Sequence, residues 1–133
     1  MNDRNSQSAA MNDGDGLPDT PGEVGSVHVI VGATRTRIVL SGEIDASLGQ
    51  ELQDAAADAE TAGRPVDVDA RHVSFMDSSG VTLLARLASR TPGRLRIIRP
   101  PDVVRFLLEV THIGDLVDVI DDDPGFDEGP LAR

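Results

Sequence analysis

Val73-Ser74-Phe75-Met76-Asp77-Ser78-Ser79-Gly80 is followed directly by the apolar run Val81-Thr82-Leu83-Leu84-Ala85-Arg86-Leu87-Ala88. The first stretch predicts the end of a buried strand and a tight polar turn, and the second predicts a helix. Asp77, Ser78 and Ser79 supply oxygen atoms where the first backbone N–H groups of that helix lack partners. Because a helix N-terminus carries positive partial charge, a phosphate group is easily held there. This turn is therefore the candidate functional site.

The composition predicts one domain with an ordinary core. The chain has 133 residues, 39% of them hydrophobic and 2% aromatic, so the core must consist of Val, Leu, Ile and Ala. No Cys is present, which excludes disulfides and thiolate metal sites. Residues 1–6 contain no apolar signal region, and no run approaches the roughly 20 apolar residues of a membrane helix. We expect a soluble cytoplasmic protein that does not contact membranes.

The negative charge belongs mainly to the two ends of the chain. The formal net charge is −11, and residues 1–23 and 121–133 each carry five acidic side chains against one Arg. Both ends are polar and poor in large apolar groups, which predicts disordered acidic tails around an ordered domain at 24–120. A chain without a basic patch is not expected to bind nucleic acid or anionic lipid.

The order of the predicted elements indicates an α/β domain. Two β-branched runs around a Gly-containing turn at 32–35 predict a hairpin, and later strands alternate with helices. The order β-β-α-β-α-β-α-(β) predicts a mixed sheet of four or five strands, with parallel inner strands and an antiparallel opening hairpin. We expect strands near 27–31, 36–40, 65–75 and 95–98, helices over about 46–62, after Gly80 and after Pro100, and a short strand or helix end at 116–120.

Two polar positions fall where a strand leads into a helix. Asp45 precedes the helix expected to end at Gly63, and the Asp77–Ser79 turn precedes the next helix. Functional turns of such sheets gather at the carboxyl ends of the strands, so the two positions are expected to share one edge of the domain. Helix capping alone is sufficient to explain Asp45.

The helix after the turn carries two apolar stripes. Val81, Leu84, Ala85 and Ala88 form the stripe that a helix on a sheet requires. Leu83 and Leu87 form a second, rotated stripe, which is either buried under a neighbouring helix or exposed to a partner.

Motifs of enzymes and cofactor sites are missing from the sequence. The turn lacks the first Gly of a nucleophile elbow, and the chain has no Walker loop, no Gly-x-Gly-x-x-Gly and no His/Cys cluster. Asp67 and Asp69 alternate with Val66 and Val68, which predicts solvated or salt-bridged carboxylates on the other sheet face or at a loop edge. We expect no enzyme activity, no cofactor and no metal.

The string Ser74-Phe75-Met76-Asp77-Ser78-Ser79-Gly80, preceded by Gly42-Glu43-Ile44-Asp45, resembles the STAS domain of bacterial anti-sigma-factor antagonists. The resemblance covers about residues 24–120, and Ile113-Gly114-Asp115-Leu116 is similar to the family's C-terminal pattern. Members of the family often have a second Gly where this chain has Thr82, so helix packing or the fit of a partner can differ here.

The resemblance implies a phosphorylation switch. The serine directly after the Asp, here Ser78, is phosphorylated in that family by an anti-sigma factor that is a serine kinase of the histidine-kinase-like ATPase fold. The unphosphorylated antagonist binds this kinase and frees a sigma factor, phosphorylation breaks the complex, and a PP2C-type phosphatase restores it. The residues expected to flank the site are Asp45, Asp77, Ser79, Gly80, Leu83 and Leu87.

Two alternatives remain open from the sequence. Ser78 can be a plain helix-capping residue, although the full motif favours a phosphoacceptor. STAS domains also occur in large stress-signalling assemblies, so the chain can instead be a scaffold or sensory module.

Overall fold

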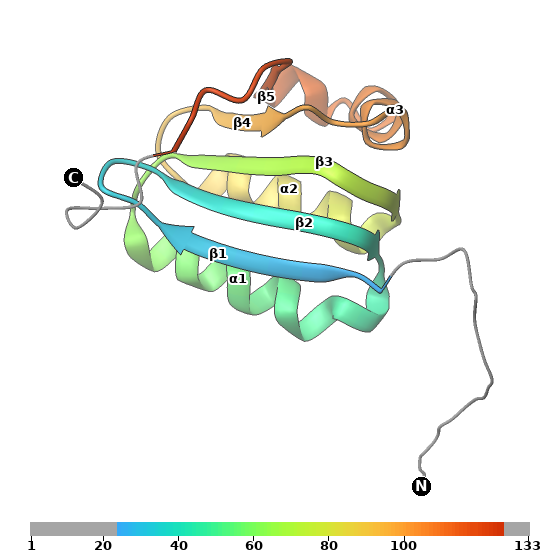
Figure 1. The fold of residues 1–133 in the computed structure, drawn as a ribbon, viewed down its shortest axis with the longest axis horizontal. Coiled ribbons are helices and arrows are strands. Elements are labelled where there is room, and N and C mark those ends of the chain that lie inside the picture. The colour runs from blue at the N-terminus through green and yellow to red at the C-terminus, as the bar shows by residue number, and fades with distance from the viewer. Residues whose placement is uncertain (1–23, 127–133) are drawn as a thin grey trace, which may run out of the picture.

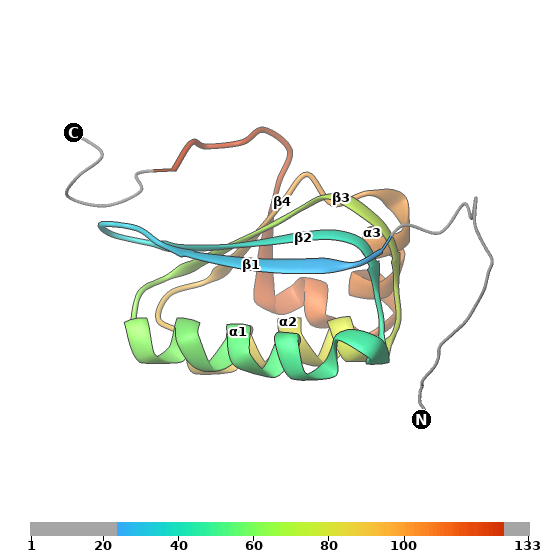
Figure 2. The same ribbon diagram turned by 60° about the horizontal axis from the view of Figure 1, so that its bottom comes forward.

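The computed structural model describes residues 24–126, so the prediction of a disordered tail at 1–23 lies outside the described residues, as does that for 127–133. Five strands form one mixed sheet in the order β1-β2-β3-β4-β5. Helices α1 and α2 lie side by side on one face of the sheet (Figures 1 and 2). The strands are β1 (Ser26–Val31), β2 (Thr36–Ile44), β3 (Val66–Met76), β4 (Leu95–Ile98) and β5 (Val117–Ile120); the helices are α1 (Gly49–Ala62), α2 (Ser78–Arg90) and α3 (Asp102–Val110), with 3-10 turns η1 (Ala46–Leu48) and η2 (Ile113–Leu116).

This architecture confirms the predicted α/β class. The β1–β2 hairpin is antiparallel, and β2, β3, β4 and β5 are all parallel. The last predicted element is the short strand β5. Gly63 ends α1 in the left-handed conformation, with φ at 68°, and its N–H donates to the carbonyl of Ala59. Helix α2 begins at Ser78, earlier than the position after Gly80 that the apolar pattern predicts, because Asp77 caps it.

Two bulges adjust the length of β3 to that of β2. The pairing runs from Thr36 opposite Val66 to Ile44 opposite Met76, and the register shifts twice on the way, between Val39 and Ser41 and between Gly42 and Glu43. At each shift β3 holds one extra residue. The two strands therefore end level with each other although β3 has 11 residues and β2 has nine.

The core lies between the sheet and the two packed helices. As expected, it consists of Val, Leu, Ile and Ala, with Met76 added. Leu83 is 3% exposed and Leu87 is fully buried, so the interpretation of these leucines as an exposed partner surface is wrong. They are buried because α2 packs against α1 as well as against the sheet. Val110 is 53% exposed, because α3 lies at the margin of the sheet and buries only Val104 and Leu108 (Figure 1).

The sheet face away from α1 and α2, called the open face here, carries charged side chains. Its central member, Asp67, is fully buried and accepts hydrogen bonds at 2.8 Å from Arg35 and Arg96. Burial raises the pKa of the Asp67 carboxyl, but the hydrogen bonds from Arg96 and Arg35 outweigh it, so the pKa is lowered. The prediction of salt-bridged carboxylates is confirmed. The open face is defined by Arg35, Arg37, Asp67, Asp69, Arg71 and Arg96.

Residues 121–126, which the sequence assigns to the C-terminal tail, continue from β5 over the open face. There Asp123 pairs with Arg37 and Arg71. These ion pairs join the segment to distant strands, and the local composition contains no trace of them.

We expect Asp67→Asn to lower the free energy of unfolding at pH 7 by about 3 kcal/mol, because it leaves the partly buried guanidinium groups of Arg35 and Arg96 without their counter-charge. The folded-state pKa of Asp67 lies below the ordinary value of an Asp carboxyl, so its contribution is complete above pH ~4 and is lost as pH falls further. Urea denaturation from pH 2 to 7 should show the wild type and the variant converging at acid pH. Asp118→Asn, in a pair that is about half exposed, is the control with little expected change.

Candidate functional site

The carboxyl ends of β2 and β3 place the two predicted acidic positions at one edge of the sheet. Ile44 and Met76 are register partners, and the N–H of Asp77 donates to the carbonyl of Ile44 at 3.1 Å. Asp45 directly follows β2, and Asp77 directly follows β3. The expectation that they share one edge of the domain is confirmed.

Asp45 is the N-cap of η1, as its position before the helix predicts. Its carboxylate accepts hydrogen bonds from the Ser47 hydroxyl at 2.6 Å and from the Ser47 N–H at 3.0 Å. These two bonds lower the pKa of the Asp45 carboxyl. Asp45 therefore stays ionised, and it contributes a fixed negative charge to this edge.

Asp77 caps α2 in the same manner. Its carboxylate accepts from the Ser79 N–H at 2.7 Å, and its carbonyl accepts from the N–H groups of Gly80 and Val81 at 3.1 and 3.3 Å. Ser78 is the first helical residue and is exposed, whereas Ser79 is half-buried. Capping thus belongs to Asp77, which leaves the Ser78 hydroxyl free of that role.

Gly80 allows the first turn of α2 to fold back over the end of β3. A Cβ atom at this position would lie 2.4 Å from Cγ and 2.8 Å from Sδ of Met76. Within the Met-Asp-Ser-Ser-Gly string, the missing side chain at Gly80 therefore lets the start of α2 pack closely against Met76 at the end of β3.

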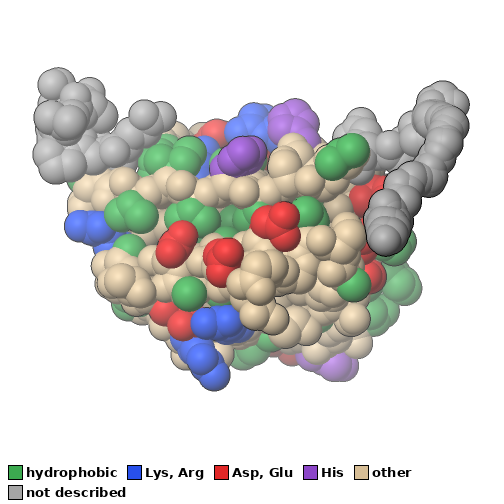
Figure 3. All heavy atoms as spheres, turned by 90° about the horizontal axis from the view of Figure 1, so that it is seen from below, with side chains coloured by type: hydrophobic (Ala, Val, Ile, Leu, Met, Phe, Trp, Pro, Cys, Tyr) green, Lys and Arg blue, Asp and Glu red, His purple; other side chains and the backbone are tan. Residues whose placement is uncertain are grey.

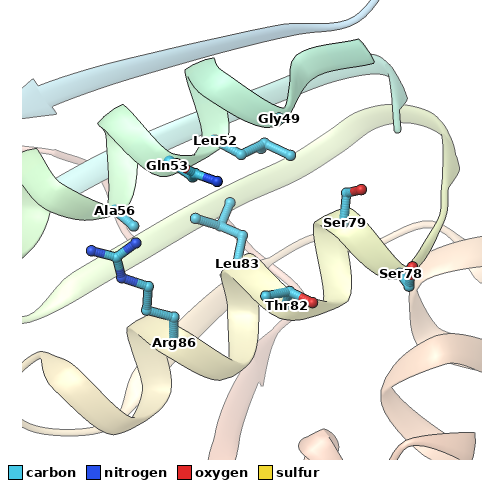
Figure 4. A pocket seen from close by; sticks show the side chains of 9 residues that line it. All are labelled: Gly49, Leu52, Gln53, Ala56, Ser78, Ser79, Thr82, Leu83 and Arg86. Atoms are coloured by element: carbon cyan, nitrogen blue, oxygen red, sulfur yellow. The ribbon is translucent and has the colours of Figure 1, made fainter. Parts of the chain in front are cut away.

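A shallow cavity of about 240 Å³ opens between α1 and α2 and reaches the turn (Figure 4). Its floor is apolar, hydroxyl groups stand at the end near the turn, and an arginine stands at the other end. Although Leu83 is buried, it forms part of this floor. The side chains concerned are Leu52, Ala56 and Leu83 on the floor, Ser78, Ser79 and Thr82 near the turn, and Arg86 at the far end.

An ion pair between the helices lies at the far end of this cavity, which is called the α1–α2 groove here. Both nitrogen atoms on one side of the Arg86 guanidinium donate to Glu60, one of them at 3.0 Å. The hydrogen bonds from Arg86 lower the pKa of the Glu60 carboxyl. The outer surface of α1 is acidic as well, as the space-filling view from that side shows (Figure 3); Glu51, Asp54 and Asp58 are its exposed acids.

The site residues expected from the sequence did not include several residues around the turn. Thr82 and Arg86 follow Ser79 at intervals of three and four residues, so their common helix face could have been found from helical spacing. Ser47 lies two residues after Asp45, so its bond to the capping carboxylate could also have been found locally. Glu60, which bonds Arg86, could not, because only the packing of α1 beside α2 places it there.

We expect Gly80→Ala to lower the free energy of unfolding by about 1–3 kcal/mol, because Met76 must move to admit the methyl group. The matched control is Gly49→Ala at the start of α1, where the new Cβ atom meets nothing within 4 Å. That change should stabilise the protein by about 0.5–1 kcal/mol. Thermal unfolding of both variants measures the difference, and equal effects would contradict this role of Gly80.

Residues 31–118 match the family model described as "Mlab, STAS domain". Similar folds occur in an anti-sigma factor antagonist from Mycobacterium paratuberculosis (19% identity, TM-score 0.64, covering 73% of this chain and 86% of that one) and in the anti-sigma factor antagonist SpoIIAA in its unphosphorylated form (23%, 0.56, 74% and 89%). A third is an anti-sigma-factor antagonist (STAS) domain protein from Planctomyces limnophilus (22%, 0.55, 76% and 93%).

No sequence among the curated proteins matches the chain significantly. Within residues 24–126, no helix combines the length and the apolar character needed to cross a membrane. The shared architecture with the three solved structures is a likeness of fold.

Proposed function

The chain belongs to the STAS domain family, and from this premise we propose that it is an anti-sigma factor antagonist controlled by phosphorylation of Ser78. The observation that carries the proposal is the exposed Ser78 at the start of α2, directly after Asp77 and at the sheet edge where Asp45 follows the neighbouring strand. The proposed partner is an anti-sigma factor that is a serine kinase of the histidine-kinase-like ATPase fold. A PP2C-type phosphatase would reverse the modification, and both would act in the cytoplasm.

The local charge supports a switch that weakens binding. A phosphate on Ser78 would add about −1.5 to −2 charges at pH 7. Asp45 and Asp77 already place negative charge at this edge, and the exposed acids of α1 extend it along the surface (Figure 3). A partner surface that fits a neutral hydroxyl would then meet added repulsion and a desolvation cost.

The fold likeness also supports the proposal. All three solved structures described above are of anti-sigma factor antagonists or a domain protein of that class, and one of them is the unphosphorylated form. Their identity to this chain is low, so the residues of the turn carry the argument for the site.

Paired baits test the proposal. Wild-type protein, Ser78→Asp and Ser89→Asp are each immobilised in a lysate of the source organism, and captured proteins are identified by mass spectrometry. Ser89 is an exposed serine near the end of the same helix, which makes it a matched control for the added charge. We expect wild type and Ser89→Asp to hold a histidine-kinase-like ATPase and Ser78→Asp to lose it by on the order of tenfold, or about 1.4 kcal/mol. Equal capture by all three would contradict the switch.

Phosphate transfer tests the acceptor itself. The captured kinase is incubated with labelled ATP and with wild type, Ser78→Ala or Ser79→Ala. Label should be lost in Ser78→Ala and kept in Ser79→Ala, because Ser79 is half-buried and faces the groove. Undiminished labelling of Ser78→Ala would show that the assignment of Ser78 is wrong.

A second candidate function is a STAS module within a multi-protein stress-signalling assembly. It is favoured by three large apolar side chains that stay more than half exposed: Phe106 and Val110, one turn apart on α3, and Leu116 on η2. Light scattering separates the candidates, because an assembly module should form large particles and the antagonist should remain a monomer or dimer.

A further inference from the structure

The segment after β5 returns over the open face of the sheet. Figure 2 shows it on the side opposite α1 and α2. The Asp123 carboxylate accepts hydrogen bonds from Arg37 at 3.0 and 3.2 Å and from Arg71 at 2.9 Å. Residues 121–126, called the strap here, thereby connect β5 with β2 and β3.

The strap makes three kinds of contact with the guanidinium group of Arg37. Arg37 donates to the Asp123 carboxylate, donates to the Gly125 carbonyl at 3.3 Å, and lies 5.1 Å from the centre of the Phe126 ring. The Asp123 carboxylate also accepts from the Gly125 N–H at 2.9 Å, which closes a turn over Asp123-Pro124-Gly125. The Arg37 side chain is 9% exposed as a result. An acidic turn followed by an aromatic ring is thus the chemistry that this arginine selects.

The surface under the strap has the opposite charge to the chain as a whole. The open face carries four arginines, Arg35, Arg37, Arg71 and Arg96, against the two carboxylates Asp67 and Asp69. The full chain has a net charge of −11. Without Asp123, this face would have an excess of positive charge in the middle of an acidic protein, which makes it complementary to an acidic peptide.

Polar contacts dominate the attachment of the strap. Residues 121–125 are exposed, and only Phe126 is half-buried. A segment that served the core would bury apolar side chains, whereas this one covers guanidinium groups with ion pairs. Such contacts are weakened by salt and can open locally without unfolding the domain.

We propose that the open face is a binding site for an acidic segment of a partner protein that carries an Asp-x-Gly-aromatic turn. The strap occupies this site within the chain, so the partner must displace it. The strap does not fill this face completely, because a cavity of about 490 Å³ lies between Phe126 of the strap and the side chains of Arg35 and Arg96. The site lies on the face of the sheet opposite the α1–α2 groove, and it does not depend on phosphorylation of Ser78.

The experiment measures binding of a fluorescent peptide with the sequence of residues 119–126. Full-length wild type is compared with Asp123→Ala/Phe126→Ala, in which the strap has lost its carboxylate and ring contacts with Arg37 and its carboxylate contact with Arg71. A tethered segment competes at millimolar effective concentration, so we expect the peptide to bind the double variant at least about tenfold more tightly than wild type. Added salt should weaken this binding.

Matched changes identify the contacts. Replacing Asp123 by Asn in the peptide, or adding Arg37→Gln to the double variant, should abolish binding. Arg71 is partly exposed, so Arg71→Gln provides a second site variant whose folding is not at risk, and it should also weaken binding. Circular dichroism melting verifies that each variant is folded.

Two results would overturn the proposal. Either equal peptide affinity for wild type and the double variant, or no binding to a folded double variant, would show that the open face is not such a site. Dimerisation of wild type that disappears in the double variant would assign the site to a second copy of this chain, and the partner assignment would then be wrong.

Discussion

The level ending of β2 and β3 is the constraint on which the site depends. Two bulges absorb the extra residues of β3, so that Ile44 stands opposite Met76 and the N–H of Asp77 reaches the Ile44 carbonyl. Both strands then pass into capped helical turns at the same height, and α1 and α2 start beside each other. A register without these bulges would move the Asp77–Gly80 turn along the sheet edge, away from Asp45, and would remove the end of the groove.

Local chemistry made much of this predictable. Asp45, Gly63 and Asp77 mark helix ends through hydrogen-bonding capacity and backbone freedom, which are properties of the residues themselves. The second stripe of α2 was not decided by the sequence, because helical spacing places Leu83 and Leu87 on a common face without saying that α1 covers it. The packing partner of a helix is a tertiary property.

The segment at 121–126 shows a second limit of the sequence. Its acidic, polar composition resembles that of a flexible tail, yet Arg37 lies 86 residues earlier in the chain and supplies the charge that fixes it. Nothing in the spacing of Arg37 or Arg71 marks them as partners of Asp123. Similarly, Asp67 was expected to form a salt bridge, but its complete burial arises only where β2, β4 and the β1–β2 turn bring arginines around it.

The capping of α2 determines what a group added to Ser78 would meet at this turn. The N–H groups of Ser79, Gly80 and Val81 are already bonded to Asp77, so a group added to Ser78 would find these donors occupied. Its arrival or removal would require no exchange of hydrogen bonds within the domain. On this geometry, the modification would change the charge of the sheet edge while leaving the hydrogen bonds that begin α2 in place.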